Sequence, residues 1–195
     1  MILPIGLDMC RLSLALVGEG NGLRNRYAKL CEAGAQKLSV FSERTHIDVH
    51  SDHVMHHRYP DSYEVGKFHF VMAVDLSPQE TDIIVSAARA AKVPLNVEDM
   101  TEFCDFHFAA VVQRGELALS VHTAGKSPAL AARLREWLAL AFPPIWERRI
   151  LEMARRRELK RSDGLAPHQV NDDARAFMED RAWLPQIYHE NEDSI

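Results

Sequence analysis

Short apolar runs alternate with amphipathic stretches along the first half of the chain. Continuous apolar runs predict strands that are buried on both faces, at residues 12–17, 37–41, 68–74 and 94–97, with a more polar outer strand around 53–59. Apolar residues at helical spacing predict helices over 22–33 and from Ser77 to about Lys92. The second of these helices opens with a Ser N-cap, Pro78 in the first turn and Glu80 at the capping-box position. Strands and helices in this order predict an α/β fold with a Rossmann-like parallel sheet.

The pattern changes near residue 110. Two alternating runs, 106–112 and 117–122, flank a turn of Gln113-Arg114-Gly115-Glu116 and predict a β-hairpin. Helices are expected over 127–142, 145–160 and 170–182, and the acidic tail 189–195 is expected to fray. We therefore expect a Rossmann-like domain over 1–110, a hairpin-and-helix segment over 111–143 and a C-terminal helical region over 144–195.

Composition narrows the class of protein. With 47% hydrophobic and 26% charged residues, the 195-residue chain can bury a globular core, and its net charge of −5 gives no reason to expect nucleic-acid or membrane partners. The N-terminus lacks a basic region, and no apolar run approaches the roughly 18 residues of a membrane span. Three cysteines without a C-x-x-C pair indicate reduced, buried thiols. We expect a soluble cytoplasmic protein.

A glycine-rich turn follows the first predicted strand. Gly18 and Gly20 have G-x-G spacing, which lets the backbone turn tightly and approach a pyrophosphate at the N-terminus of the following helix. The third small position is instead Leu23, and Glu19 adds a negative charge near the expected pyrophosphate. The pattern therefore predicts a dinucleotide site, with a turn that only packs strand on helix as the alternative.

Two further features are candidates for ligand binding. Glu43 lies a little over 20 residues past the glycines, where a carboxylate can accept hydrogen bonds from ribose hydroxyls and favour NAD over NADP. The alternative is a solvated residue at a strand end. The loop Thr123-Ala124-Gly125-Lys126-Ser127 opens a helix and offers N–H groups and one ammonium to an acidic ligand, or is simply a capped helix start.

Four of the chain's histidines fall between residues 50 and 57. His53 and His57 would share one face of a strand while His56 faces the other way, and no spacing matches a zinc motif. We expect a solvated outer strand there and no metal site.

A series of short motifs runs in a fixed order from residue 3 to about residue 143. They are Leu3-Pro4-Ile5, Leu7-Asp8, Val17-Gly18-Glu19-Gly20, Glu32-Ala33-Gly34-Ala35, Asn96-Val97-Glu98-Asp99, Cys104-Asp105-Phe106-His107-Phe108, Arg114-Gly115-Glu116-Leu117 and Thr123 to Arg135. Together they resemble the N-terminal module of siroheme synthases, the precorrin-2 dehydrogenase and sirohydrochlorin ferrochelatase family. Since no methyltransferase domain follows, the chain resembles a stand-alone form.

The resemblance implies a chemistry. Members of this family use NAD to remove a hydride from precorrin-2, giving sirohydrochlorin, and many then insert ferrous iron to make siroheme. It also implies a homodimer, with residues 111–143 serving dimerisation and substrate binding. Glu19 and Leu23 leave open a chelatase-only member without NAD chemistry, and a non-catalytic regulator that binds a nucleotide or tetrapyrrole is a further alternative.

The resemblance also implies roles for particular residues. Asp99 falls on the family's catalytic carboxylate, and the carboxyl edge of a parallel sheet is where such folds bind ligands, although Asp99 could simply cap the next turn. His122 is a possible second acid–base or metal-contacting group. The expected cofactor-binding residues are Gly18, Gly20, Asn21, Gly22, Ser42, Glu43 and Asp75. The expected substrate-binding residues are His122, Thr123, Ala124, Gly125, Lys126 and Ser127.

Overall fold

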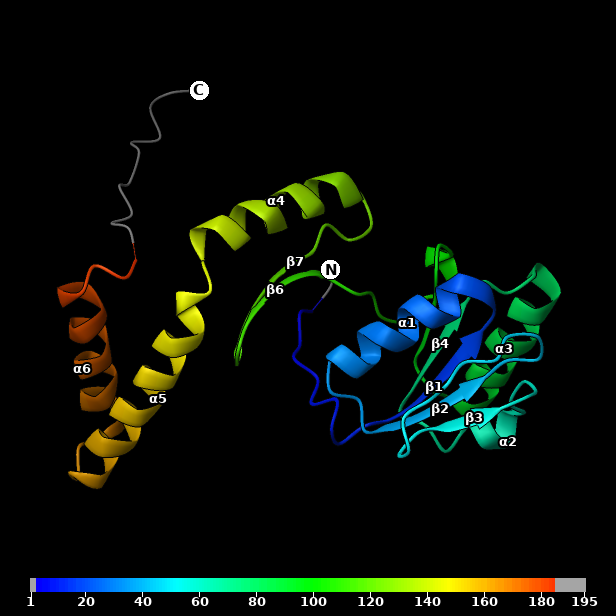
Figure 1. The fold of residues 1–195 in the computed structure, drawn as a ribbon, viewed down its shortest axis with the longest axis horizontal. Helices are drawn as coiled ribbons and strands as arrows, with labels where there is room; N and C mark the ends of the chain where they lie inside the picture. The colour runs from blue at the N-terminus through cyan, green and yellow to red at the C-terminus, as the bar shows by residue number, and fades with distance from the viewer. Residues whose placement is uncertain (1–2, 185–195) are drawn as a thin grey trace. The chain divides into compact units, whose positions relative to one another are not determined.

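The computed structural model describes residues 3–184, which divide into two compact units (Figure 1). The first unit runs to Phe108 and includes Ala124–Lys126. The second comprises Ala109–Thr123 and the chain from Ser127 onward. Each unit is described by itself.

The first unit is built on a five-stranded sheet in the order β3-β2-β1-β4-β5, and every neighbouring pair is parallel. This confirms the predicted Rossmann-like parallel sheet. Leu16 in the central strand lies opposite Val40 on one side and Met72 on the other. The strands are β1 (Ser13–Gly18), β2 (Lys37–Phe41), β3 (Val54–His56), β4 (Phe70–Val74) and β5 (Leu95–Val97).

Helices cover both faces of this sheet, as Figure 1 shows. Leu14 and Leu16 pack with Leu23 of α1 on one face, while the alternating Ala15 and Val17 pack with Ile84 of α3 on the other. Because both faces are buried, β1 is apolar without interruption. The helices of this unit are α1 (Gly20–Glu32), α2 (Ser62–Val65), α3 (Pro78–Ala91) and the 3-10 helix η1 (Thr101–Phe103).

Helix α3 begins with the capping box that the sequence predicts. The Ser77 hydroxyl accepts from the Glu80 N–H, and the Glu80 carboxylate accepts from the Ser77 N–H at 2.8 Å. Asp61 and Glu64 form the same capping box on α2, which the sequence analysis missed. With four residues, α2 is too short to show a helical period, and the same holds for η1.

The predicted first hairpin strand, 106–112, begins too early. The Asp105 carboxylate accepts from the Leu95 N–H, the Asn96 amide donates to the Phe106 carbonyl, and the Phe106 ring lies 5.1 Å from that of Phe70. These contacts hold residues 105 and 106 on the first unit, beside β5. The prediction was therefore wrong for residues 106–109, and the hairpin starts at Ala110.

The second unit contains an antiparallel hairpin and helices. Val112 pairs with Leu119, and Gly115 in the turn has a φ of +58°, which favours glycine. Helices α5 and α6 lie side by side (Figure 1) and are joined by an ion pair between Arg156 and Asp173. The elements are β6 (Ala110–Arg114), β7 (Leu117–Val121), α4 (Pro128–Ala141), α5 (Ile145–Ser162) and α6 (Pro167–Asp180). The expected tail, 189–195, lies outside the described residues.

Helix α4 leaves an apolar face uncovered. Ala131 is its only buried residue, whereas Leu130, Leu134 and Trp137 are 51%, 40% and 62% exposed. These three positions are spaced i, i+4 and i+7 and so lie on one side of the helix. Among the described helices, none is both long enough and apolar enough to span a bilayer.

The prediction that the cysteines are buried is wrong for Cys10. All three cysteines are free thiols, but Cys10 is exposed because it lies in the irregular segment before β1 rather than in the sheet. Cys31 and Cys104 are half-buried, and burial raises the pKa of the Cys104 thiol, which donates to the Val97 carbonyl.

Candidate functional site at the carboxyl edge of the sheet

The turn between β1 and α1 has the backbone shape of a dinucleotide-binding turn. A Cβ on Gly18 would lie 2.4 Å from the Val74 carbonyl oxygen, so only glycine lets β1 approach β4 this closely. Gly20 has a φ of +60°, a conformation that glycine adopts without strain. Helix α1 begins at Gly20, so its N-terminus faces the sheet edge where such folds place a pyrophosphate.

We expect Gly18→Ala to destabilise the protein by about 1–3 kcal/mol, because the new methyl group would overlap a backbone carbonyl that cannot move aside. Urea unfolding of both proteins measures this difference. Gly6→Ala is the matched control, since a Cβ at Gly6 meets no atom within 4 Å. Equal unfolding midpoints for Gly18→Ala and wild type would contradict the close approach of β1 and β4.

Side chains of this chain already engage the N–H groups of the turn. The Gly22 N–H donates to the Asp75 carboxylate at 2.8 Å, and the Gly20 N–H donates to the Thr45 hydroxyl at 2.7 Å. Any Cβ on Gly22 would lie 2.3 Å from Asp75 Oδ2, which explains why the position is glycine. The donors that a pyrophosphate needs are thus present and are bonded within the protein.

Glu19 lies in the turn, but its carboxylate reaches the carboxyl end of β2. It accepts from the Ser42 and Thr45 hydroxyls at 2.7 and 2.8 Å and from the Glu43 and Arg44 N–H groups at 3.0 and 3.3 Å. Burial to 6% exposure raises the pKa of the carboxyl, but these hydrogen bonds and one from Tyr59 outweigh burial and lower the pKa to about 2. Glu19 is therefore ionised at neutral pH.

Arg44, Tyr59 and Glu80 link this carboxylate to α3. The Tyr59 hydroxyl lies 2.8 Å from Glu19 Oε1 and 3.0 Å from Glu80 Oε1, and Arg44 forms a two-pronged ion pair with Glu80. Burial and the neighbouring carboxylates raise the pKa of Tyr59, while the Arg44 hydrogen bond lowers that of Glu80 to about 2. The network ties the ends of β1 and β2 to the first turn of α3.

Acidic residues follow the next two strands of the same edge. Asp75 directly follows β4, and Glu98 and Asp99 directly follow β5. Asp75 and Asp99 have φ values of +50° and +62°, and such strain in non-glycine residues is concentrated at functional sites. Glu98 pairs with Arg26 of α1, whose guanidinium lies 4.5 Å above the Phe108 ring. Asp99 itself is exposed.

The loop predicted to bind the substrate falls at the division between the two units. Ala124–Lys126 groups with the first unit, where a Cβ on Gly125 would lie 3.9 Å from the Thr101 methyl group. Ala124 and Gly125 both have positive φ. In the second unit, the Ser127 hydroxyl caps α4 by accepting from the Leu130 N–H. The capped start of α4 is thus observed, and substrate binding by residues 122–127 stays a prediction.

The structure therefore brings together some of the residues that are predicted to bind the cofactor. Gly18, Gly20, Gly22, Ser42 and Asp75 lie in or against the turn. Asn21 is exposed in the first turn of α1, and Glu43 contributes its N–H to Glu19 while its side chain is exposed.

Sequence reasoning missed Thr45, Tyr59 and Glu80 as parts of this edge. They lie 26, 40 and 61 positions after Glu19, so only the folded sheet brings Thr45 and Tyr59 to that carboxylate and Glu80 to the Tyr59 hydroxyl. Leu23, which stands at the third small position of the glycine pattern, does not crowd the turn. It is fully buried in the core between α1 and the sheet.

The histidine segment is less solvated than predicted. His53 is buried, with its ring nitrogens 2.9 Å from the Tyr27 hydroxyl and the Ala35 carbonyl, so it fastens the start of β3 to α1. The strand is nevertheless an edge strand, as predicted. Over residues 3–184, no cluster of His, Cys, Asp or Glu side chains has the arrangement needed to hold a metal ion.

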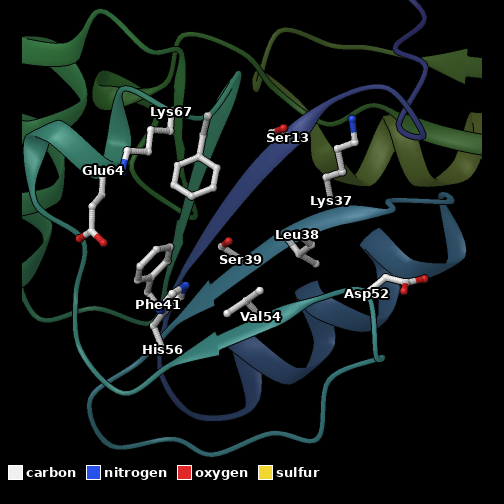
Figure 2. A pocket seen from close by; sticks show the side chains of 11 residues that line it. Ser13, Lys37, Leu38, Ser39, Phe41, Asp52, Val54, His56, Glu64 and Lys67 are labelled. Atoms are coloured by element: carbon white, nitrogen blue, oxygen red, sulfur yellow. The ribbon is translucent and has the colours of Figure 1, made fainter.

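A cavity of about 410 Å³ lies elsewhere, at the β2–β3 side of the sheet (Figure 2). Phe41, Phe68 and His56 contribute rings to it, and Lys37 and Lys67 contribute ammonium groups. It lies on the face of the sheet that α2 and α3 cover, where Phe41 packs with Val65 and Ile84. None of the predicted site residues lines it, so the carboxyl edge remains the candidate site.

An open parallel sheet with helices on both faces and a glycine turn after its central strand defines a Rossmann-like nucleotide-binding protein. Residues 5–110 match a family model described as "Putative NAD(P)-binding", and the chain belongs to this family, the one that includes the N-terminal module of siroheme synthases.

Curated relatives and a solved structure are similar to the chain. It is 27% identical to siroheme synthase of Methylococcus capsulatus over 145 residues, covering 72% of this chain and 31% of the relative. It is also 27% identical to siroheme synthase of Thiobacillus denitrificans over 182 residues, covering 91% of this chain and 37% of that relative. The chain thus spans about a third of the length of these relatives. A structure titled "SirC, precorrin-2 dehydrogenase" aligns with a TM-score of 0.69 and 16% identity, covering 95% of this chain and 93% of that one, which shows a shared fold.

The backbone of the glycine turn and its side chains differ in how well they fit a dinucleotide. Its backbone fits, because Gly18 permits the close approach and the first N–H groups of α1 face the sheet edge. Its side chains fit only after Asp75 has released the Gly22 N–H and the Glu19 carboxylate has left the end of β2.

Proposed function

We propose that this chain catalyses the NAD-dependent dehydrogenation of precorrin-2 to sirohydrochlorin. The observation that carries the proposal is Asp99, a strained and exposed carboxylate on the same sheet edge as the glycine turn. Membership of the siroheme synthase module family supports the substrate class. The likeness in fold to a structure titled as a precorrin-2 dehydrogenase agrees with it over nearly the whole chain.

The reaction removes a hydride and a proton from precorrin-2, so that NAD becomes NADH and one proton is released. When bound, NAD supplies the ring that accepts the hydride. The N–H groups of Gly20 and Gly22 would hold its pyrophosphate once their internal partners have moved. Asp99 accepts the proton as a general base and, being exposed, passes it to water.

The exposed carboxylate of Glu43 at the end of β2 favours NAD over NADP. Negative charge there repels the 2′-phosphate of NADP, whereas the ribose hydroxyls of NAD can donate to a carboxylate.

The segment Ala124–Lys126 is proposed to bind the substrate's carboxylates. Precorrin-2 and sirohydrochlorin each carry eight carboxylates, and Lys126 provides an exposed ammonium. Ala124 and Gly125 have positive φ, so the backbone turns sharply there and can present N–H groups to an anion. Roles for His122, Thr123 and Ser127 are proposed on the family resemblance alone.

A second candidate activity is insertion of ferrous iron into sirohydrochlorin. What favours it is that Asp75 and Thr45 already engage the N–H donors of the turn, a state that suits a reaction without dinucleotide. Asp99 would then accept the pyrrole protons that leave as iron, a substrate here, enters the macrocycle. The enzyme is also proposed to be cytoplasmic, which agrees with its free thiols. It is proposed to form a homodimer, which agrees with the uncovered apolar face of α4.

The test is anaerobic incubation of the purified protein with precorrin-2 and saturating NAD, followed by absorbance. Appearance of sirohydrochlorin in proportion to NADH supports the dehydrogenase. Absence of turnover, together with iron insertion into supplied sirohydrochlorin, would replace it by the chelatase. If neither reaction occurs and the tetrapyrrole still binds, the protein is a non-catalytic binder.

A further inference from the structure

The Glu19 carboxylate is held in a cage of hydrogen-bond donors. Two backbone N–H groups, from Glu43 and Arg44, and the hydroxyls of Ser42, Thr45 and Tyr59 all lie within 3.3 Å of its oxygens. Backbone N–H groups and hydroxyls that converge in this way form a binding site for an anion. The chain fills this site with a side chain of its own.

The cage occupies the place where a dinucleotide needs room. In Rossmann-like folds the adenosine ribose lies at the carboxyl end of the second strand, beside the glycine turn. Here that end is Phe41, and the caged carboxylate lies on Ser42, Glu43 and Arg44, the three residues that directly follow it. The ribose and the Glu19 carboxylate therefore compete for one position.

The network around the cage keeps the carboxylate in place. Arg44 forms an ion pair with Glu80 in the first turn of α3, and the Arg44 guanidinium lies 3.8 Å from the Glu19 carboxylate. The Tyr59 hydroxyl bridges both carboxylates. For Glu19 to leave, an ionised group must give up its buried donors, which costs free energy that a bound ligand has to supply.

We propose that Glu19 is an internal competitor of the dinucleotide and thereby sets the affinity of the cofactor site. NAD binds only when the Glu19 carboxylate leaves its cage, so the wild-type protein binds NAD weakly. This inference rests on the proposed function for the identity of the ligand. It makes Glu19 the residue that limits the affinity of the cofactor site and accounts for an acidic residue inside a glycine turn.

Calorimetric titration of NAD into the 195-residue protein, without tetrapyrrole, tests this role. Glu19→Gly removes the competitor and suits the extended backbone at this position, so we expect its Kd for NAD to fall by about tenfold or more. Glu19→Gln keeps the shape without the charge and should give a smaller gain. Glu64→Gln is the matched control: Glu64 is also ion-paired, with Arg58, but lies outside the turn, and its Kd should equal that of wild type.

Thermal unfolding establishes that each variant is folded. If Glu19→Gly does not fold, the same titration is made with Glu19→Gln and with Tyr59→Phe. The second of these variants removes one donor from the cage, and each should bind NAD more tightly than wild type. Folded Glu19 variants that bind NAD no more tightly than wild type overturn the proposal. If they gain affinity while no variant oxidises precorrin-2, the dehydrogenase function fails and Glu19 is still the competitor. If wild type oxidises precorrin-2 and the Glu19 variants gain no affinity for NAD, the dehydrogenase function stands and Glu19 is not a competitor of the dinucleotide.

Discussion

Asp99→Asn is expected to lower the rate of precorrin-2 oxidation by about 10²–10⁴-fold, because an amide cannot accept the proton that leaves the substrate. Asparagine is the appropriate replacement, since Asp99 has a φ of +62° and asparagine tolerates this left-handed conformation better than alanine. The variant should therefore fold normally and bind NAD as wild type does. Initial rates of sirohydrochlorin formation at saturating NAD measure the effect.

The control for this experiment is Asp48→Asn, a carboxylate in the same unit that is fully exposed and to which no role in cofactor or substrate binding is assigned. Its rate should equal that of wild type. A loss confined to kcat in Asp99→Asn agrees with a role in proton transfer, whereas a rise in KM alone indicates that Asp99 only helps to bind substrate. If Asp99→Asn keeps the wild-type rate, the catalytic base lies elsewhere and the reading of this sheet edge is wrong.

Much of the first unit could be predicted from the sequence, because its signals are local. An uninterrupted apolar run predicts β1, and the capping box of Ser77 and Glu80 predicts the first turn of α3. The same reasoning extended the hairpin into residues 106–109, since alternation cannot show that Asp105 and Phe106 are held beside β5. Local pattern gives the element, and tertiary hydrogen bonds decide where it begins.

The candidate site was predictable only in part. Gly18 and Gly20 could be located from their spacing after an apolar run, whereas Gly22 and Asp75 were expected from the family resemblance. The conformation of Glu19 could not, because the sequence shows an extra charge in the turn and not the donors that hold it. Those donors come from Ser42, Thr45 and Tyr59, which reach Glu19 only through the order of the strands.

Leu134→Glu combined with Trp137→Glu is expected to convert a homodimer to a monomer, since both side chains are exposed on the uncovered face of α4. Large apolar side chains at the centre of an interface each contribute about 2 kcal/mol or more, so the dimer Kd should rise at least about 100-fold. Light scattering after size-exclusion chromatography measures the mass in solution. Ala132→Glu adds a negative charge to the opposite side of the helix and should leave the dimer intact. A wild-type mass of 22.1 kDa, or a double variant that stays dimeric, would show that this face of α4 does not mediate dimerisation.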